Sequence, residues 1–109
     1  MGLFRSDYAK LNKEEKKAIS RIAYAMIYAD KPVSDDEIDS AESSGIKKED
    51  LLNSKNEDLE EAIGVIAQSD DKTKKRCKKV IDKIMSANGF HASPEDALSI
   101  KLNKAWGLD

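Results

Sequence analysis

Apolar residues recur at helical spacing along the chain, most clearly in residues 19–27. Their i, i+3, i+4, i+7, i+8 spacing puts the side chains on one face of an α-helix. They are Ile19, Ile22, Ala23, Met26 and Ile27. Neighbouring alanines and tyrosines extend the apolar surface around the helix, so we predict that it is the most buried element. It should end at Asp30-Lys31-Pro32, because proline disfavours the α conformation in the residue before it.

Several further helices follow from the same kind of pattern. Residues 34–45 begin with a capping-box sequence and end at a glycine, as a short helix does. The remaining apolar stripes lie in residues 59–67, 77–85 and 98–106. We predict Ser54 or Asn56 as the cap of the first of these helices. No stretch shows the alternation typical of a β-strand, so the predicted fold class is all-α.

Two segments of the chain align with each other without a gap, residues 19–41 and residues 77–99. In each, an apolar helix is followed by a tight turn and by a second helix that starts with acidic residues. We therefore predict one domain over residues 1–109, a compact bundle of about six to seven helices. It would contain an internal pseudo-two-fold repeat of a helix-turn-helix unit, with repeat halves at about 12–45 and 70–107.

The composition narrows the class of protein. With 39% hydrophobic residues the chain can form a core, and a formal net charge of −2 predicts no strong overall attraction to nucleic acid. Cys77 is the only cysteine, so no intrachain disulfide forms and a reducing compartment fits. We find neither a signal peptide nor an apolar run long enough to span a membrane, and we expect a cytoplasmic protein.

The turns of the two copies carry a recognisable motif. Residues 29–37 read Ala-Asp-Lys-Pro-Val-Ser-Asp-Asp-Glu, and residues 87–95 read Ala-Asn-Gly-Phe-His-Ala-Ser-Pro-Glu. Both resemble the Ala-Asp-Gly-x-Val-x-x-x-Glu signature of TerB-like domains. That signature occurs twice in tellurite-resistance proteins and in the N-terminal part of a membrane-anchored J-domain co-chaperone. The resemblance covers nearly the whole chain, including the Gly45-Ile46 turn and the closing Trp106-Gly107-Leu108.

The TerB-like resemblance implies a bacterial, cytoplasmic, all-helical domain that acts in stress-response or envelope-associated complexes. It also implies that acidic turn residues bind a divalent cation such as Ca²⁺ or Mg²⁺. The positions that match are Asp30, Glu37, Asn88 and Glu95. The chain departs from the signature where Lys31-Pro32 replaces the glycine turn and where Asn88 replaces the aspartate.

The same four residues have a simpler interpretation, which we favour. Asp30 and Asn88 are common turn formers, and Glu37 and Glu95 are charges that suit the start of a helix. A true EF-hand is excluded, because its first ligand positions would fall on core-type residues, whereas Ca²⁺ needs six to eight oxygen ligands. A cation site formed by Asp30, Glu37 and Glu95 from both halves remains an alternative.

Catalysis is not expected from this sequence. Cys77 lies on an apolar stripe, which favours an inert thiol in the core. His91 aligns with Val33 of the other copy, which favours a packing role. No phosphate-binding loop, nucleophile elbow or zinc-ligand spacing is present. We therefore predict no catalytic residues and a non-enzymatic binding or scaffold domain with a protein partner.

One segment offers an alternative to the cation site, the run of basic residues within 72–79. Its members are Lys72, Lys74, Lys75, Arg76, Lys78 and Lys79. Such a run can contact an acidic protein, nucleic acid or anionic lipid, which would make the domain a charge-driven adaptor without a metal. A solvated helix face, offset by the acidic segments 35–42 and 57–61, is the interpretation we favour. Trp106 could anchor a partner, although its place on an apolar stripe favours a core position.

Overall fold

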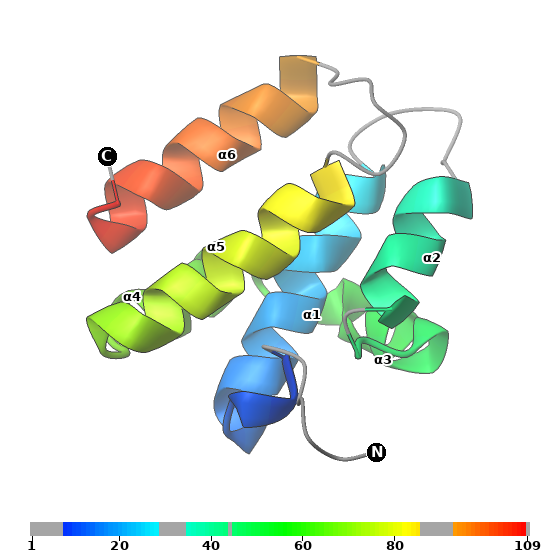
Figure 1. Ribbon diagram of the computed structural model, residues 1–109, viewed down its shortest axis with the longest axis horizontal. Coiled ribbons are helices and arrows are strands. Elements are labelled where there is room, and N and C mark those ends of the chain that lie inside the picture. The colour runs from blue at the N-terminus through cyan, green and yellow to red at the C-terminus, as the bar shows by residue number, and fades with distance from the viewer. Residues whose placement is uncertain (1–7, 29–34, 44, 86–92, 109) are drawn as a thin grey trace.

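The computed structural model describes residues 8–28, 35–43, 45–85 and 93–108; for residues 9, 35–37 and 93–96 it describes the backbone alone. These residues form six α-helices and two short 3₁₀ helices (η1 and η2), without a strand (Figure 1). The helices are η1 (Tyr8–Lys10), α1 (Lys13–Tyr28), α2 (Asp35–Ser43), α3 (Lys48–Asn53), η2 (Ser54–Asn56), α4 (Leu59–Ala67), α5 (Asp71–Met85) and α6 (Ser93–Trp106). The all-α prediction is confirmed. No helix among the described residues is both long and apolar enough to cross a membrane.

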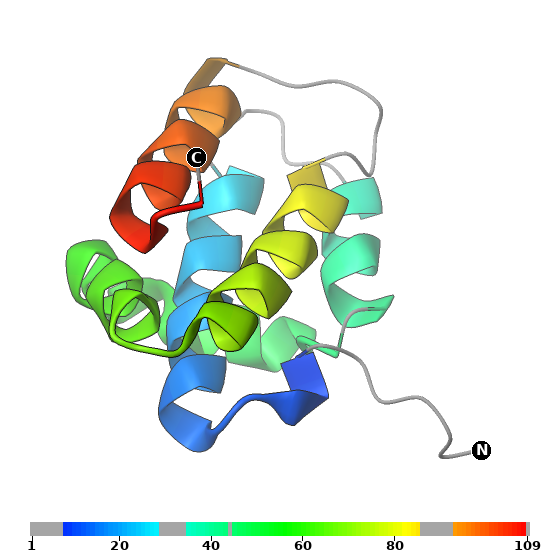
Figure 2. The same ribbon diagram turned by 60° about the vertical axis from the view of Figure 1, so that its left-hand side comes forward.

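Helix α1 is the central element, as its apolar pattern predicts. It packs against α3, α4 and α5, and in Figures 1 and 2 it runs through the middle of the bundle. The five residues of its stripe have no exposed surface; they are Ile19, Ile22, Ala23, Met26 and Ile27. The stripes of α4 and α5 face the same core, and Cys77 is buried there.

Polar side chains cap the starts of α1 and α4. Asn12 and Glu15 form reciprocal bonds before α1, in which each backbone N–H donates to the other side chain, at 3.0 and 2.8 Å. Asp58 Oδ1 accepts from the Glu61 N–H at 3.1 Å and so caps α4. The prediction that Ser54 or Asn56 caps α4 is therefore wrong, because residues 54–56 form η2 instead. A side-chain acceptor at a helix start satisfies N–H groups that the helix leaves unpaired.

The predicted glycine stop of α2 is confirmed, and α6 also ends at a glycine. Gly45 and Gly107 have φ of 108° and 67°, a left-handed conformation that glycine adopts without steric cost. The residue after each glycine donates its N–H back into the helix, from Ile46 to the Ala41 carbonyl and from Leu108 to the Asn103 carbonyl, both at 2.9 Å. This closure is the usual glycine-terminated end of a helix.

Trp106 lies in the core, as the pattern favours. Its side chain is 1% exposed, and its indole Nε1–H donates to the backbone carbonyl of Ile63 at 3.0 Å. Because Ile63 belongs to α4, this one side chain joins α6 to α4. The closing segment of the chain is thereby attached to the middle of the bundle.

The two predicted repeat halves pack differently. Helix α2 contacts α1, α3 and α5, whereas α6 contacts α4 and α5. The second helices of the two copies therefore have different neighbours. The helical content of both copies is confirmed within the described residues, but their pseudo-two-fold arrangement stays a prediction.

Candidate functional site

The residues that the sequence assigns to a cation fall largely outside the described part of the chain. Asp30 and Asn88 lie outside the described residues, as does His91. Glu37 and Glu95 belong to the first turns of α2 and α6, where only the backbone is described. In both views these two first turns stand apart from each other (Figures 1 and 2). Among the described residues, no group of three or more histidine, cysteine or acidic side chains is placed to hold a metal.

The cation prediction can be tested directly in solution. A ligand that binds only the folded protein raises its stability, by about 2.7 kcal/mol at a concentration one hundred times Kd. If the four residues bind Ca²⁺ or Mg²⁺, millimolar ion should raise the melting temperature, and Asp30→Ala with Glu95→Ala should abolish the increase. An unchanged melting temperature of the wild-type protein would reject the site.

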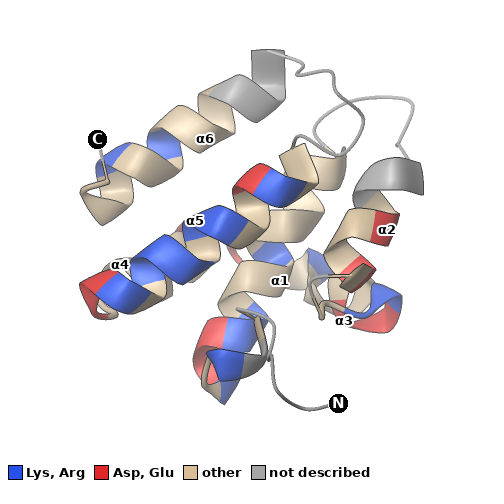
Figure 3. Ribbon diagram, viewed as in Figure 1, with Lys and Arg blue, Asp and Glu red and all other residues tan. Residues whose placement is uncertain are grey.

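Four residues of the basic run share one face of α5. Lys72, Lys75, Arg76 and Lys79 have the i, i+3, i+4, i+7 spacing that places side chains on one helix face. We call these four residues the basic face of α5. Figure 3 shows Lys and Arg along the length of this helix. The opposite side is buried in the core, so the helix separates an apolar interior from a strongly positive surface.

The basic face borders a shallow, open depression of the protein surface. It forms part of an open pocket of about 630 Å³, with η1 and the residue that follows Gly107 at its edges. The lining residues are Lys10, Lys72, Lys75, Arg76, Lys78, Lys79, Asp82 and Leu108. Six cationic side chains and one carboxylate line this pocket, and Lys78 is paired with that carboxylate, so the excess of positive charge favours an anionic ligand. We call this volume the α5 pocket.

The cations of α5 differ in how far they are paired. Lys78 forms an ion pair with Asp82 and donates to the Ser99 hydroxyl at 3.0 Å, which ties α5 to α6. Among the described residues, no carboxylate forms an ion pair with Lys75 or Lys79, and both side chains are exposed. These two lysines are therefore available to a ligand at no cost in broken ion pairs.

Asp70 supports the start of the basic helix. Its Oδ1 accepts from the backbone N–H of Thr73 at 2.8 Å. Hydrogen bonds from the Thr73 backbone and side chain hold the pKa of Asp70 below its ordinary value of 3.8, and the charges of Arg76 and Lys72 act in the same direction. The carboxylate is therefore ionised at neutral pH and caps the start of α5, the helix that carries the basic residues.

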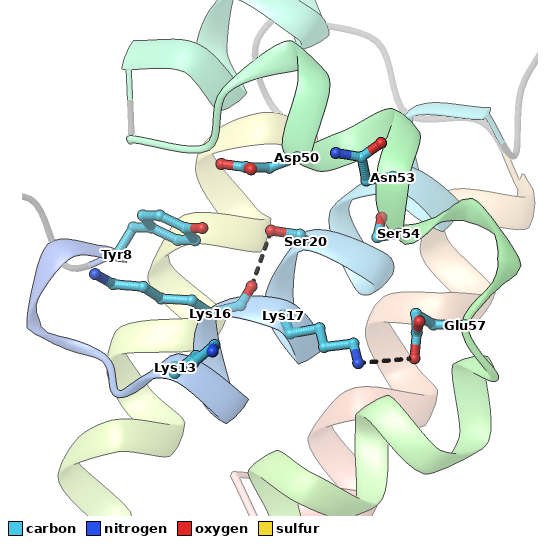
Figure 4. A pocket seen from close by; sticks show the side chains of 9 residues that line it. All are labelled: Tyr8, Lys13, Lys16, Lys17, Ser20, Asp50, Asn53, Ser54 and Glu57. Carbon is cyan, nitrogen blue, oxygen red and sulfur yellow. Dashed lines mark hydrogen bonds and ion pairs between the residues drawn. The ribbon is translucent and has the colours of Figure 1, made fainter.

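A second, smaller pocket of about 290 Å³ lies where η1 and α1 meet α3 and η2 (Figure 4). Its polar groups are mostly satisfied within the protein. The buried hydroxyls of Ser20 and Ser54 donate to the carbonyls of Lys16 and Leu51, at 2.8 and 2.6 Å. Lys17 pairs with Glu57 at 3.5 Å, and the Lys16 ammonium lies 5.7 Å from the centre of the Tyr8 ring. We therefore interpret this pocket as a packing contact between helices rather than a ligand site.

Tyr8 makes the stability of this contact between helices sensitive to high pH. Burial raises the pKa of the Tyr8 phenol above its ordinary value of 10.0; the nearby Asp50 charge adds to this, and the hydrogen bond with Ser20 opposes it. The folded protein therefore holds the phenol proton more tightly than the unfolded chain does. The contribution of this protonated phenol to the free energy of unfolding is complete below pH 10.0 and is lost as the pH rises through the pKa of the folded state. The free energy of unfolding, measured with urea, should decline as the pH rises above 10.0. Tyr8→Phe should make this decline smaller. Equal declines in the two proteins would contradict this.

Comparisons of the chain with models of protein families, with curated proteins and with solved structures each return no match. The resemblance to TerB-like domains therefore rests on the sequence motif alone. The α5 pocket is identified from its own geometry and charge. The basic run is visible in the sequence, but Lys10 and Leu108 are distant from it along the chain, and no local pattern places them at the same pocket.

Proposed function

We propose that this chain is a non-enzymatic binding domain and that the basic face of α5 is its contact surface for an anionic partner. The observation that carries the proposal is the convergence of six cationic side chains on one open pocket. Desolvated or concave positive surfaces attract anions and raise the rate of their association.

The pairing of acidic residues elsewhere strengthens this proposal. The acidic segment 57–61 would offset the basic run if its charges were free. Instead Glu57 pairs with Lys17 of α1, and Glu60 pairs with Lys101 of α6. Two of its carboxylates are thus partly neutralised by lysines of other helices. The positive charge at Lys75 and Lys79 has no such counterpart among the described residues.

We also propose that the domain belongs to the TerB-like class and acts as a scaffold in the bacterial cytoplasm, in a stress-response or envelope-associated complex. The support is the motif at residues 29–37 and 87–95, which occurs at matching places of the two halves. The all-helical fold is compatible with this class. A non-enzymatic role is further supported by Cys77, the only thiol, which is buried in the core.

The contact surface is tested by removing two charges that do not support the fold. Lys75→Gln with Lys79→Gln should lower the salt concentration at which the protein elutes from immobilised heparin. If each lysine contributes about 1 kcal/mol, the pair should weaken binding by roughly thirtyfold. Lys47→Gln with Lys48→Gln is the matched control, because these exposed lysines at the start of α3 carry the same charge and lie outside the α5 pocket. Equal effects of the two double variants would mean that overall charge, rather than this surface, controls binding.

A further inference from the structure

We infer that the α5 pocket binds a compact ligand that carries two or more linked phosphate groups. This inference rests on the proposed function, because it names the ligand of the same surface. Five of the six positive side chains come from α5, four of them on its basic face, and the sixth, Lys10, comes from η1. A cation on a second element gives an anion a contact that one helix face alone does not provide.

The size of the basic face limits the length of the ligand. From Lys72 to Lys79 a helix rises about 10 Å, at about 1.5 Å per residue. Carboxylates stand at both ends of this span: Asp71, which lies 3.9 Å from the Lys74 ammonium, and Asp82, which pairs with Lys78. A long polyanion that continued along the helix axis would pass beyond the basic face to these carboxylates and gain no further attraction there. A ligand that fits between the two carboxylates keeps its charge beside the cations.

The charge of the pocket favours phosphate over carboxylate. Five of its six cations are lysines, whose ammonium groups are compact charges with three rotatable donors. Such groups adapt to tetrahedral oxyanions without the planar geometry that a carboxylate–arginine pair prefers. A terminal phosphate carries about −1.5 to −2 charges at neutral pH and offers three acceptor oxygens, whereas a carboxylate carries one charge. Linked phosphates thus carry more negative charge than the same number of carboxylates.

The surroundings of the pocket favour a soluble ligand over a membrane surface. Membrane association through a basic patch is strengthened by exposed apolar side chains that enter the lipid. The exposed large hydrophobic residues in the described part of the chain are Leu52 on α3 and Ile100 on α6. Neither lines the α5 pocket, and Leu108 at its edge is partly buried. A phospholipid headgroup shares the phosphate chemistry but would bring no apolar contact here.

Calorimetric titration of the full chain with inorganic tripolyphosphate tests the inference, with citrate as a polycarboxylate of similar compactness. We expect tripolyphosphate to bind at least about tenfold more tightly than citrate, a difference of about 1.4 kcal/mol. Lys75→Gln with Lys79→Gln should weaken tripolyphosphate binding by about tenfold or more, while Lys47→Gln with Lys48→Gln should leave it within about twofold. Circular dichroism of each variant verifies that it is folded.

Three results would overturn the inference in different ways. Equal binding of citrate and tripolyphosphate would leave an anion-binding surface, and so the proposed function, without a preference for phosphate. Binding to vesicles that contain phosphatidylinositol bisphosphate, with none to free tripolyphosphate, would identify a lipid surface as the partner. Tighter binding to a short DNA duplex than to tripolyphosphate would identify nucleic acid. If heparin retention is also independent of Lys75 and Lys79, the proposed function fails as well.

Discussion

Replacing Trp106 by alanine should lower the free energy of unfolding by about 3–5 kcal/mol. The indole is 1% exposed and joins α6 to α4 through its bond to the Ile63 carbonyl. Its removal leaves a large cavity between these helices and takes away one attachment of α6 to α4. Since a domain of this size is stable by about 5–15 kcal/mol in total, much of its stability depends on this side chain.

Urea unfolding followed by circular dichroism measures this loss. Trp106→Phe is the matched variant, because it keeps an aromatic ring and removes the N–H donor. It should cost less than the alanine variant, with about 0.5–1.5 kcal/mol attributable to the hydrogen bond itself. An alanine variant as stable as the wild type would show that α6 does not depend on Trp106 for its packing.

The second large effect is expected at Ile22, in the middle of α1. This side chain has no exposed surface, and α1 contacts α3, α4 and α5. Ile22→Ala should cost about 2–5 kcal/mol, through lost apolar burial and the cavity left behind. Ile22→Val removes one methylene group and should cost about 0.5–1.5 kcal/mol.

The chain contains a matched control for this substitution. Ile100 also lies in a helix but is 55% exposed, so Ile100→Ala makes the same chemical change at the surface. It should change stability by no more than about 0.5 kcal/mol. Similar losses at Ile22 and Ile100 would contradict the assignment of α1 as the centre of the core.

The fold was predictable from the sequence to the extent that it depends on periodicity. The stripe of α1 became fully buried because one apolar face must be removed from water wherever the helix packs. The glycine stops at Gly45 and Gly107 were equally readable, because a left-handed residue is needed there. The cap of α4 could not be predicted from the sequence, because Ser54 and Asp58 are both good capping residues. Tertiary packing, rather than local sequence, placed residues 54–56 in η2.

Relations between distant segments could not be predicted in the same way. Aligned stripes show that two helices each bury one face, but they do not show against which neighbour. Helices α2 and α6 occupy matching places in the sequence and nevertheless have different partners. The charge balance is a second example, because the pairing of Glu57 with Lys17 and of Glu60 with Lys101 depends on tertiary contacts.

The binding surface that we propose for this domain is the basic face of α5. Two-dimensional ¹H–¹⁵N NMR during titration with tripolyphosphate tests it most directly, because every backbone amide reports its own environment. We predict that the largest shifts fall on residues 72–79, with further shifts at Lys10 and Leu108. Shifts centred instead on the small pocket around Ser20 and Ser54, or on residues 30 and 88, would contradict the account.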